Sequence, residues 1–177
     1  MIRIFIIGYM GAGKTTVGKS LAQRMNLNYI DTDYFIENRY RKKVSEIFAA
    51  EGEERFRNIE RSILLEVSEF EDIVISTGGG LPCFHDNMTI MNERGITVYL
   101  DVPMEELAVR LGFSKNVRPV LKKRSGEELI DFIKGNLMVR KPFYEQAKIR
   151  FQTGKAYTKN DIELLVKEVK AFSTMSS

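Results

Sequence analysis

Glycine, lysine and threonine crowd into one short stretch near the N-terminus. Residues 8–15, with the sequence GYMGAGKT, fit the pattern G-x-x-x-x-G-K-[S/T] at every fixed position. Glycines let successive N–H groups turn toward a phosphate chain, and the N-terminus of a following helix adds partial positive charge. Lys14 brings a mobile positive charge to the terminal phosphates, and Thr15 offers a hydroxyl to Mg²⁺. The sequence therefore predicts a site for a nucleoside triphosphate and magnesium.

Two carboxylates follow a short predicted strand in Asp31-Thr32-Asp33. In an open α/β sheet, ligands bind beyond the carboxyl ends of the strands. One carboxylate could hold Mg²⁺ through water, while the other accepts a hydrogen bond from the hydroxyl of an acceptor molecule. Spacing alone leaves a second interpretation open, in which Thr32 or Asp33 is only the N-cap of a helix.

Three consecutive glycines, Gly78–Gly80, end another predicted strand. Their missing side chains would let a ligand touch bare backbone at the same edge of the sheet. A tight turn before Pro82 explains them equally well.

Three arginines are candidate ligands for an anion, and each has an ordinary alternative. Arg57 lies one position off a predicted buried stripe, where periodicity alone favours a solvated salt bridge with Glu53. Arg118 lies in a predicted loop and Arg140 precedes Lys141-Pro142, so either could be a surface arginine.

The pattern of apolar residues predicts the elements that must position these groups. Strands are expected at residues 2–7, 28–31, 73–76, 97–100 and 149–152. Helices are expected at 15–25, 34–40, 45–70 with a break near Gly52, 86–93, 103–111, 127–136 and 160–172, and residues 142–146 begin or continue another helix. One stripe of the long helix should be buried, at Phe56, Ile59, Ile63, Val67 and Phe70.

Strands that alternate with helices predict a parallel, doubly wound α/β sheet. The 177 residues suit one domain, 1–177, and residues 112–126 have the weak periodicity of a mobile loop.

Composition narrows the class of protein. Hydrophobic residues make up 44% and charged residues 29% of the chain, as in a globular protein with a core. The net charge of +3 is too small for a typical nucleic-acid binder.

With one cysteine, Cys83, and one histidine, His85, we expect no internal disulfide and no structural zinc site. We expect the Cys83 thiol to be packed and the His85 imidazole to lie at the surface or to be hydrogen-bonded. No signal peptide or membrane-spanning run is visible, so we expect a cytoplasmic protein without membrane or nucleic-acid partners.

A phosphate-binding loop does not by itself name the reaction. The segment Thr158-Lys159-Asn160-Asp161 does not match the Asn-Lys-x-Asp motif with which GTPase switches bind guanine. Two segments, 28–31 and 96–101, resemble the apolar strand ending in an acid that motor ATPases carry, but the chain is short for a motor.

Taken together, the segments resemble the shikimate kinase family. The matching segments span about residues 4–150 in the family's order and at similar spacing: Gly8–Thr15, Asp31–Asp33, Phe48–Glu60, Ser76–Gly80, Asn116–Pro119 and Arg140–Tyr144. The resemblance implies a nucleoside monophosphate kinase-like fold of three layers, with a five-stranded parallel sheet of order 2-3-1-4-5. It also implies ATP-dependent phosphorylation of the 3-hydroxyl of shikimate on the route to chorismate and aromatic amino acids, by a monomer.

The resemblance also assigns roles by position. It implies that Asp33 binds the acceptor hydroxyl, and that Arg118 belongs to a mobile lid at about 112–124 and reaches the phosphates. The helical region at about 32–61 would bind substrate. The remaining implied contacts are nucleotide at Gly11, Ala12, Gly13, Lys14, Thr15 and Thr16, magnesium at Thr15 and Asp31, and substrate at Arg57, Gly79, Gly80 and Arg140.

The sequence departs from the family pattern in two places. The common Gly-Lys-Ser-Thr is Gly-Lys-Thr-Thr here, which keeps the hydroxyl, and the lid is rich in lysine at Lys122-Lys123-Arg124. The adenine-contacting loop near 152–155 matches too poorly to assign a residue. Two alternatives stay open: a gluconate-type or nucleotide-type kinase, and a nucleotide-dependent binding switch that has no acceptor.

Overall fold

The sheet at the centre of the molecule has five parallel strands. A computed structural model describes residues 2–113, 126–152 and 157–175. The strands are β1 (Arg3–Ile7), β2 (Asn28–Asp31), β3 (Ile73–Ser76), β4 (Ile96–Asp101) and β5 (Ile149–Gln152), in the order β2-β3-β1-β4-β5. The predicted strand order, 2-3-1-4-5, is therefore confirmed.

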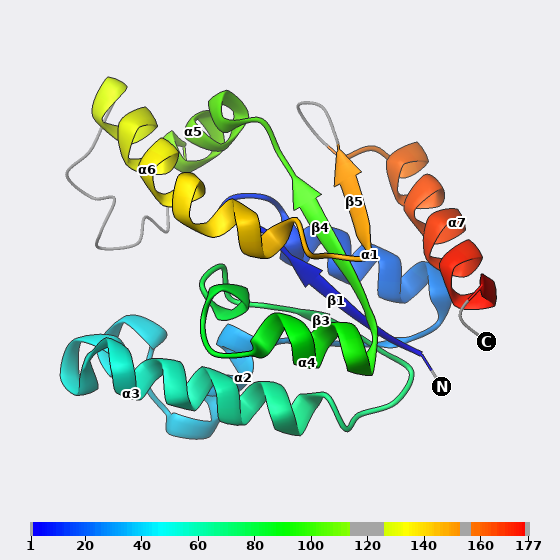
Figure 1. The fold of residues 1–177 in the computed structure, drawn as a ribbon, viewed down its shortest axis with the longest axis horizontal. Coiled ribbons are helices and arrows are strands. Elements are labelled where there is room, and N and C mark those ends of the chain that lie inside the picture. Colours follow the sequence, from blue (N-terminus) through cyan, green and yellow to red (C-terminus); the bar gives the residue numbers. More distant parts are fainter. Residues whose placement is uncertain (1, 114–125, 153–156, 176–177) are drawn as a thin grey trace.

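Helices cover both faces of this sheet. They are α1 (Lys14–Met25), α2 (Thr32–Tyr40), α3 (Val44–Val67), α4 (Asn87–Arg94), α5 (Met104–Gly112), α6 (Glu127–Tyr144) and α7 (Lys159–Met175), with a short 3-10 helix, η1, at Leu81–Cys83. Helices α1 and α7 pack against each other and against the strands, and Figure 1 shows α1 behind the sheet and α4 in front of it. The arrangement is the expected three-layer α/β fold.

Burial follows from the strand sequences. Residues Ile4–Ile7 of β1 and all four residues of β3 are buried, because both faces of a central parallel strand are covered by helices. Strand β5 lies at the edge, and its residues alternate between buried and exposed. The core therefore lies on both faces of the sheet at β1, the strand that leads into the loop 8–13.

Several predicted boundaries are corrected by the structure. The stripe on α3 is buried from Phe56 to Val67, but Phe70 lies beyond the end of the helix and is 37% exposed. Gly52 breaks the helix as expected, with φ 80° and ψ 173°. Helix α6 runs without a break from residue 127 to 144, because Pro142 lies close to its C-terminus and removes only one helical hydrogen bond.

The predicted lid cannot be compared with the structure. Of residues 112–124, only Gly112 and Phe113 lie within the described residues, and Arg118 and Lys122–Arg124 lie outside them. Within the described ranges, no helix is long and apolar enough to cross a membrane.

Candidate active site

Three neighbouring strands bring the predicted residues to one edge of the sheet. The loop 8–13 follows β1, Asp31 ends β2, and Gly78–Gly80 follow β3. Because the sheet order is β2-β3-β1, the carboxyl ends of these strands lie next to one another. A Cβ atom added to Gly79 would lie 3.4 Å from the backbone nitrogen of Met10. The glycine turn therefore lies directly against the phosphate-binding loop.

The phosphate-binding loop curls around its own lysine. Gly8, Gly11 and Gly13 have φ angles of 144°, 79° and 91°, which residues with a side chain rarely adopt. The Lys14 ammonium donates hydrogen bonds to the carbonyl oxygens of Gly8 and Tyr9, at 2.9 and 3.0 Å. Helix α1 begins at Lys14 with no side-chain cap, so its first N–H groups face the loop. The predicted residues Gly11, Ala12, Gly13, Thr15 and Thr16 all lie on this loop or the first turn of the helix.

Two residues that sequence reasoning missed donate hydrogen bonds to carbonyl oxygens of this loop. The hydroxyl of Tyr157 donates a hydrogen bond of 2.6 Å to the carbonyl oxygen of Ala12. The Arg110 guanidinium donates to the carbonyl oxygens of Gly11 and Ala12, both at 3.3 Å, and lies 5.5 Å from the centre of the Tyr157 ring. Both come from elements far along the chain, and nothing in their local sequence distinguishes them from surface residues.

The structure distinguishes between the two strands that end in an acid. The hydroxyl of Thr15 donates a hydrogen bond of 3.0 Å to Asp31, at the end of β2. Asp101, at the end of β4, instead accepts from Arg150 at 2.5 Å and from Gln152 at 3.3 Å. Of these two acids, Asp31 is therefore the one that contacts Thr15.

The donor set at Thr15 and Asp31 suits Mg²⁺. A hydroxyl and a carboxylate are hard oxygen ligands, which Mg²⁺ prefers together with phosphate oxygens and water. Across the described residues, no group of three or more His, Cys, Asp or Glu side chains is arranged to hold a metal. A magnesium ion here would thus depend on the nucleotide for many of its ligands.

Asp31 also settles how α2 begins. Its carboxylate accepts hydrogen bonds from the backbone N–H groups of Asp33 and Tyr34, at 3.1 and 3.3 Å. Asp31 is therefore the N-cap, and the interpretation of Thr32 or Asp33 as the cap is wrong. Thr32 is buried, and its hydroxyl accepts from the N–H of Gly78 at 2.9 Å. The contact ties the start of α2 to the glycine turn.

The Asp33 carboxylate packs against the backbone of Gly78 in that turn. A Cβ atom added to Gly78 would come within 2.6 Å of a carboxylate oxygen of Asp33. The absence of a side chain at Gly78 is thus what makes room for Asp33 at the edge of the sheet. Asp33 follows β2, and β3 is the one strand that separates β2 from β1, which leads into the phosphate-binding loop.

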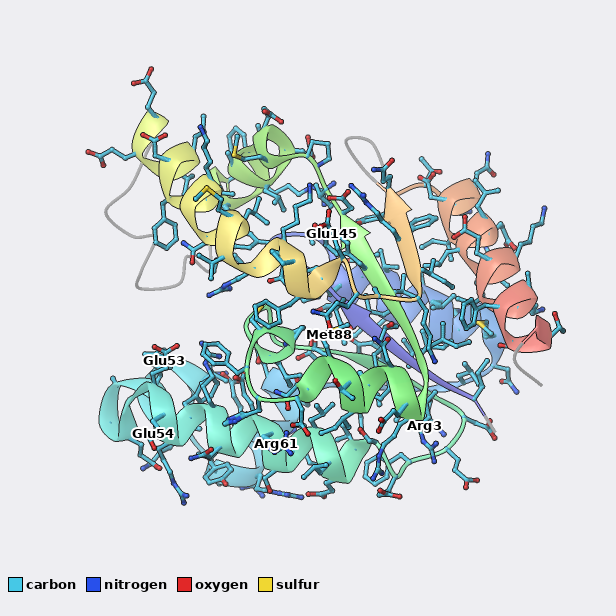
Figure 2. The ribbon with its side chains drawn as sticks, viewed as in Figure 1. Arg3, Glu53, Glu54, Arg61, Met88 and Glu145 are labelled. Atoms are coloured by element: carbon cyan, nitrogen blue, oxygen red, sulfur yellow. The ribbon has the colours of Figure 1, made fainter. Side chains whose placement is uncertain are left out.

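The Arg57 side chain is largely covered, so its interpretation as a solvated group is wrong, although the expected ion pair with Glu53 is present. Its side chain is 11% exposed and pairs with Glu60 at 2.6 Å, whose side chain is 3% exposed. It also pairs with the more exposed Glu53, which Figure 2 labels on α3. The guanidinium lies 4.0 Å from the centre of the Phe84 ring. Burial acts to lower the pKa of Arg57, but the Glu60 and Glu53 carboxylates raise it above its usual range.

Periodicity could not reveal this burial, because a second element covers Arg57. A Cβ atom added to Gly80 would lie 2.7 Å from the Arg57 guanidinium. The backbone of Gly80 has φ −87°, an ordinary angle, so the need for glycine here comes from Arg57 alone. Arg57 and Gly80 therefore meet because the start of η1 packs against α3.

Arg140 approaches the same turn from α6. Its guanidinium lies 5.7 Å from the centre of the Tyr9 ring, on the phosphate-binding loop. Burial raises the pKa of the Cys83 thiol to about 11, while the charges of Arg140 and Arg57 act to lower it. Both arginines are thus close enough to Cys83 to act on one thiol. We call Asp33, Arg57, Gly78–Gly80 and Arg140 the acceptor cluster.

The glycine turn carries N–H groups that are ready for a ligand. Gly79 and Gly80 are buried, and among the described residues their N–H groups donate no hydrogen bond. Buried backbone donors are rarely left unpaired in folded proteins. These two N–H groups lie beside two arginines, an arrangement that suits the binding of an anion. The segment is also a turn, because the N–H groups of Leu81 and Cys83 donate hydrogen bonds to the carbonyl oxygens of Gly78 and Gly80. The interpretation of the triple glycine as a turn is therefore confirmed, and ligand binding at its backbone stays a prediction.

Comparison with known proteins identifies the family. The family model described as shikimate kinase matches residues 10–170. The chain belongs to the shikimate kinase family. A shikimate kinase from Parabacteroides distasonis is 60% identical over 162 residues, which cover 92% of this chain and 94% of the relative.

Solved structures of shikimate kinases support the same family assignment. The crystal structure of the shikimate kinase from Bacteroides thetaiotaomicron has a TM-score of 0.90 and 47% identity, with 98% of each chain covered. The shikimate kinase from Acinetobacter baumannii, solved in complex with shikimate, has a TM-score of 0.84 and 30% identity, with 100% of this chain and 95% of the other covered. The chain is therefore a kinase with the shikimate kinase fold, and a gluconate-type or nucleotide-type kinase is not favoured.

Proposed function

We propose that the chain transfers the γ-phosphoryl group of ATP to the 3-hydroxyl of shikimate, in the biosynthesis of chorismate and aromatic amino acids. The observation that carries the proposal is the contact between two halves of one site. A Cβ atom on Gly79 would touch both the N–H of Met10 and the carbonyl of Gly8, at 3.4 and 3.5 Å. An anion bound at the glycine turn would thus lie beside a triphosphate bound in the loop.

The phosphate-binding loop would hold ATP. Main-chain N–H groups from Gly11 to Thr16 would surround the phosphates, and the Lys14 ammonium would exchange the carbonyls of Gly8 and Tyr9 for phosphate oxygens. A carbonyl pair holds the lysine in place before the nucleotide arrives. Little reorganisation is then needed to stabilise the charge of the transferred group.

Thr15 and Asp31 would hold Mg²⁺ with the nucleotide, Asp31 through a water molecule. Their 3.0 Å contact and their oxygen chemistry support this assignment. The bound ion would neutralise charge on the phosphates. Asp31 is already held by two backbone N–H groups, so its free lone pairs point in a defined direction.

Asp33 would orient the acceptor. Its carboxylate would accept a hydrogen bond from the 3-hydroxyl and take its proton, as the hydroxyl oxygen forms a bond to the γ-phosphorus and the bond to ADP breaks. The close contact with Gly78 supports a fixed position for this carboxylate. Most of the rate enhancement would come from alignment and neutralisation of charge.

Arg57 and Arg140 would bind the carboxylate of shikimate, with the N–H groups of Gly79 and Gly80. Arginine is suited to this role because its planar fork makes paired hydrogen bonds to a carboxylate. Glu60 would hold the Arg57 guanidinium in one orientation. Arg118, which lies outside the described residues, would reach the phosphates from a lid at about 112–124 that excludes water.

The wider setting is part of the same proposal. We place the enzyme in the cytoplasm as a monomer of one domain, 1–177, with shikimate and ATP as its small-molecule partners.

One assay tests the proposal. ADP release is measured in a coupled reaction with ATP and Mg²⁺, with shikimate, gluconate, a nucleoside monophosphate or no acceptor. We expect shikimate alone to stimulate release, and removal of Mg²⁺ with a chelator to abolish it. Slow hydrolysis that no acceptor stimulates would instead favour a nucleotide-dependent binding switch, and stimulation by another acceptor would reassign the substrate.

A further inference from the structure

Tyr144 joins the last turn of α6 to the glycine turn. Its side chain is fully buried, and its hydroxyl donates a hydrogen bond of 2.6 Å to the carbonyl oxygen of Gly79. Its ring stacks on Tyr99 of β4, with the ring centres 5.2 Å apart and the planes at 30°. Burial raises the pKa of Tyr144 well above its usual range, so the hydroxyl remains a hydrogen-bond donor.

The hydrogen bond from Tyr144 to the Gly79 carbonyl also restricts the direction of the Gly80 N–H. The carbonyl of Gly79 and the N–H of Gly80 belong to one planar trans peptide, so they point in opposite directions. When Tyr144 holds the carbonyl on one side, the N–H of Gly80 has to point to the other. Glycine backbones adopt many conformations, so this peptide plane needs an external restraint to keep one orientation.

The N–H on the other side of this peptide unit belongs to Gly80. The amide of Gly80 is buried and donates no hydrogen bond among the described residues. The position of its absent side chain faces the Arg57 guanidinium, at 2.7 Å. Arg140 lies one helical turn before Tyr144 on α6. A single hydroxyl therefore connects the helix that carries one arginine to the backbone beside the other.

We propose that Tyr144 is a positioning residue for the acceptor: it aims the Gly80 N–H at the acceptor carboxylate and holds the glycine turn at a set distance from Arg140. This inference rests on the function proposed above. Tyr144 acts through the peptide that it holds and not on the reacting atoms. Its loss should thus raise the KM for shikimate and leave the KM for ATP unchanged.

Tyr144→Phe is the test variant, because it removes the hydroxyl and keeps the stacked ring. The matched control is Tyr99→Phe, on the other ring of the same stack, which loses a hydroxyl hydrogen bond of 3.1 Å to Asp101. We expect Tyr144→Phe to raise the KM for shikimate about tenfold with kcat within about twofold, as for loss of one buried hydrogen bond. Tyr99→Phe should leave both KM values unchanged. A Tyr144→Phe enzyme with a lower melting temperature but the normal KM for shikimate would overturn the proposal.

A measurement on the unaltered protein keeps the proposal testable if Tyr144→Phe fails to fold. Glycine-selective ¹⁵N labelling makes the Gly80 amide visible by NMR during titration with shikimate. We expect a saturable shift of the Gly80 signal, and none with an analogue that lacks the carboxylate. If shikimate stimulates ADP release but leaves the Gly80 signal in place, this inference is wrong and the proposed function stands. If shikimate does not stimulate release, the proposed function fails first.

Discussion

The phosphate-binding loop and the acceptor cluster lie side by side but are built in different ways. The loop is one contiguous segment of nine residues, 8–16, whose lysine is held by main-chain carbonyls of the same segment. The acceptor cluster takes its residues from α2, α3, the turn after β3 and α6. Its arginine on α3 is held by a buried carboxylate and an aromatic ring.

The glycines of the two regions show the difference most clearly. Gly13 has φ 91°, so its own backbone excludes most side chains. Gly80 has φ −87°, which any residue could adopt, and only the Arg57 guanidinium excludes a side chain there. The same residue type can thus be required by the local backbone in one region and by a tertiary contact in the other. The five test substitutions below probe the two regions separately.

Lys14→Ala should have the largest effect, because it removes the charge that balances the transferred phosphoryl group. We expect kcat to fall about a thousandfold, as when a preorganised charge-stabilising group is lost. Steady-state ADP release measures this, with circular dichroism to show that the variant is folded. Lys19→Ala, on the exposed side of the same helix, is the control and should retain normal turnover. Retained turnover in Lys14→Ala would exclude the loop as the catalytic phosphate site.

Asp33→Asn should come next. The amide keeps the shape of the side chain but cannot take the proton of the acceptor hydroxyl, so kcat should fall about a hundredfold or more. Calorimetry should show that shikimate still binds within a few-fold of its normal affinity. A near-normal kcat would mean that Asp33 has no role in proton transfer.

Arg57→Lys keeps the charge beside Glu60 but loses the planar fork. We expect the KM for shikimate to rise about tenfold, with the KM for ATP unchanged, and the same pattern for Arg140→Lys. Arg61→Lys is the control, because Arg61 lies one turn farther along α3 and pairs with Asp86 near the surface. An unchanged KM for shikimate in both test variants would place the carboxylate elsewhere.

Gly80→Ala should have the smallest effect of the five. The added methyl group meets a flexible arginine that can shift, so the KM for shikimate should rise only about fivefold, equivalent to about 1 kcal/mol. Gly135→Ala is the matched control, since no atom lies within 4 Å of its added Cβ on α6. It should leave KM unchanged and stabilise the helix by up to about 1 kcal/mol in thermal unfolding. Equal KM values in the two variants would mean that Gly80 and Arg57 do not cooperate.

Much of the fold was predictable because its signals are local. Strands β2, β3 and β5 have the bounds that alternation and β-branching predict, and the break at Gly52 follows from its residue type. The end of α3 was missed because Phe70 continues the apolar spacing after the helix has ended. Phe70 instead contacts Phe35 of α2 edge-on, at 6.5 Å between ring centres, and that contact depends on tertiary packing.

The phosphate-binding loop and the alternation of strands and helices could be predicted from the amino-acid sequence, because both depend on consecutive residues. The tertiary structure was needed to show that Asp31 contacts Thr15 while Asp101 contacts Arg150, because the order of strands in the sheet brings distant segments together. It was also needed to show that Arg57 packs against Gly80, and that Tyr157 and Arg110 donate hydrogen bonds to the loop. Periodicity along one helix describes which residues share a face, but the burial of a residue at the margin of that face depends on the element that packs beside it.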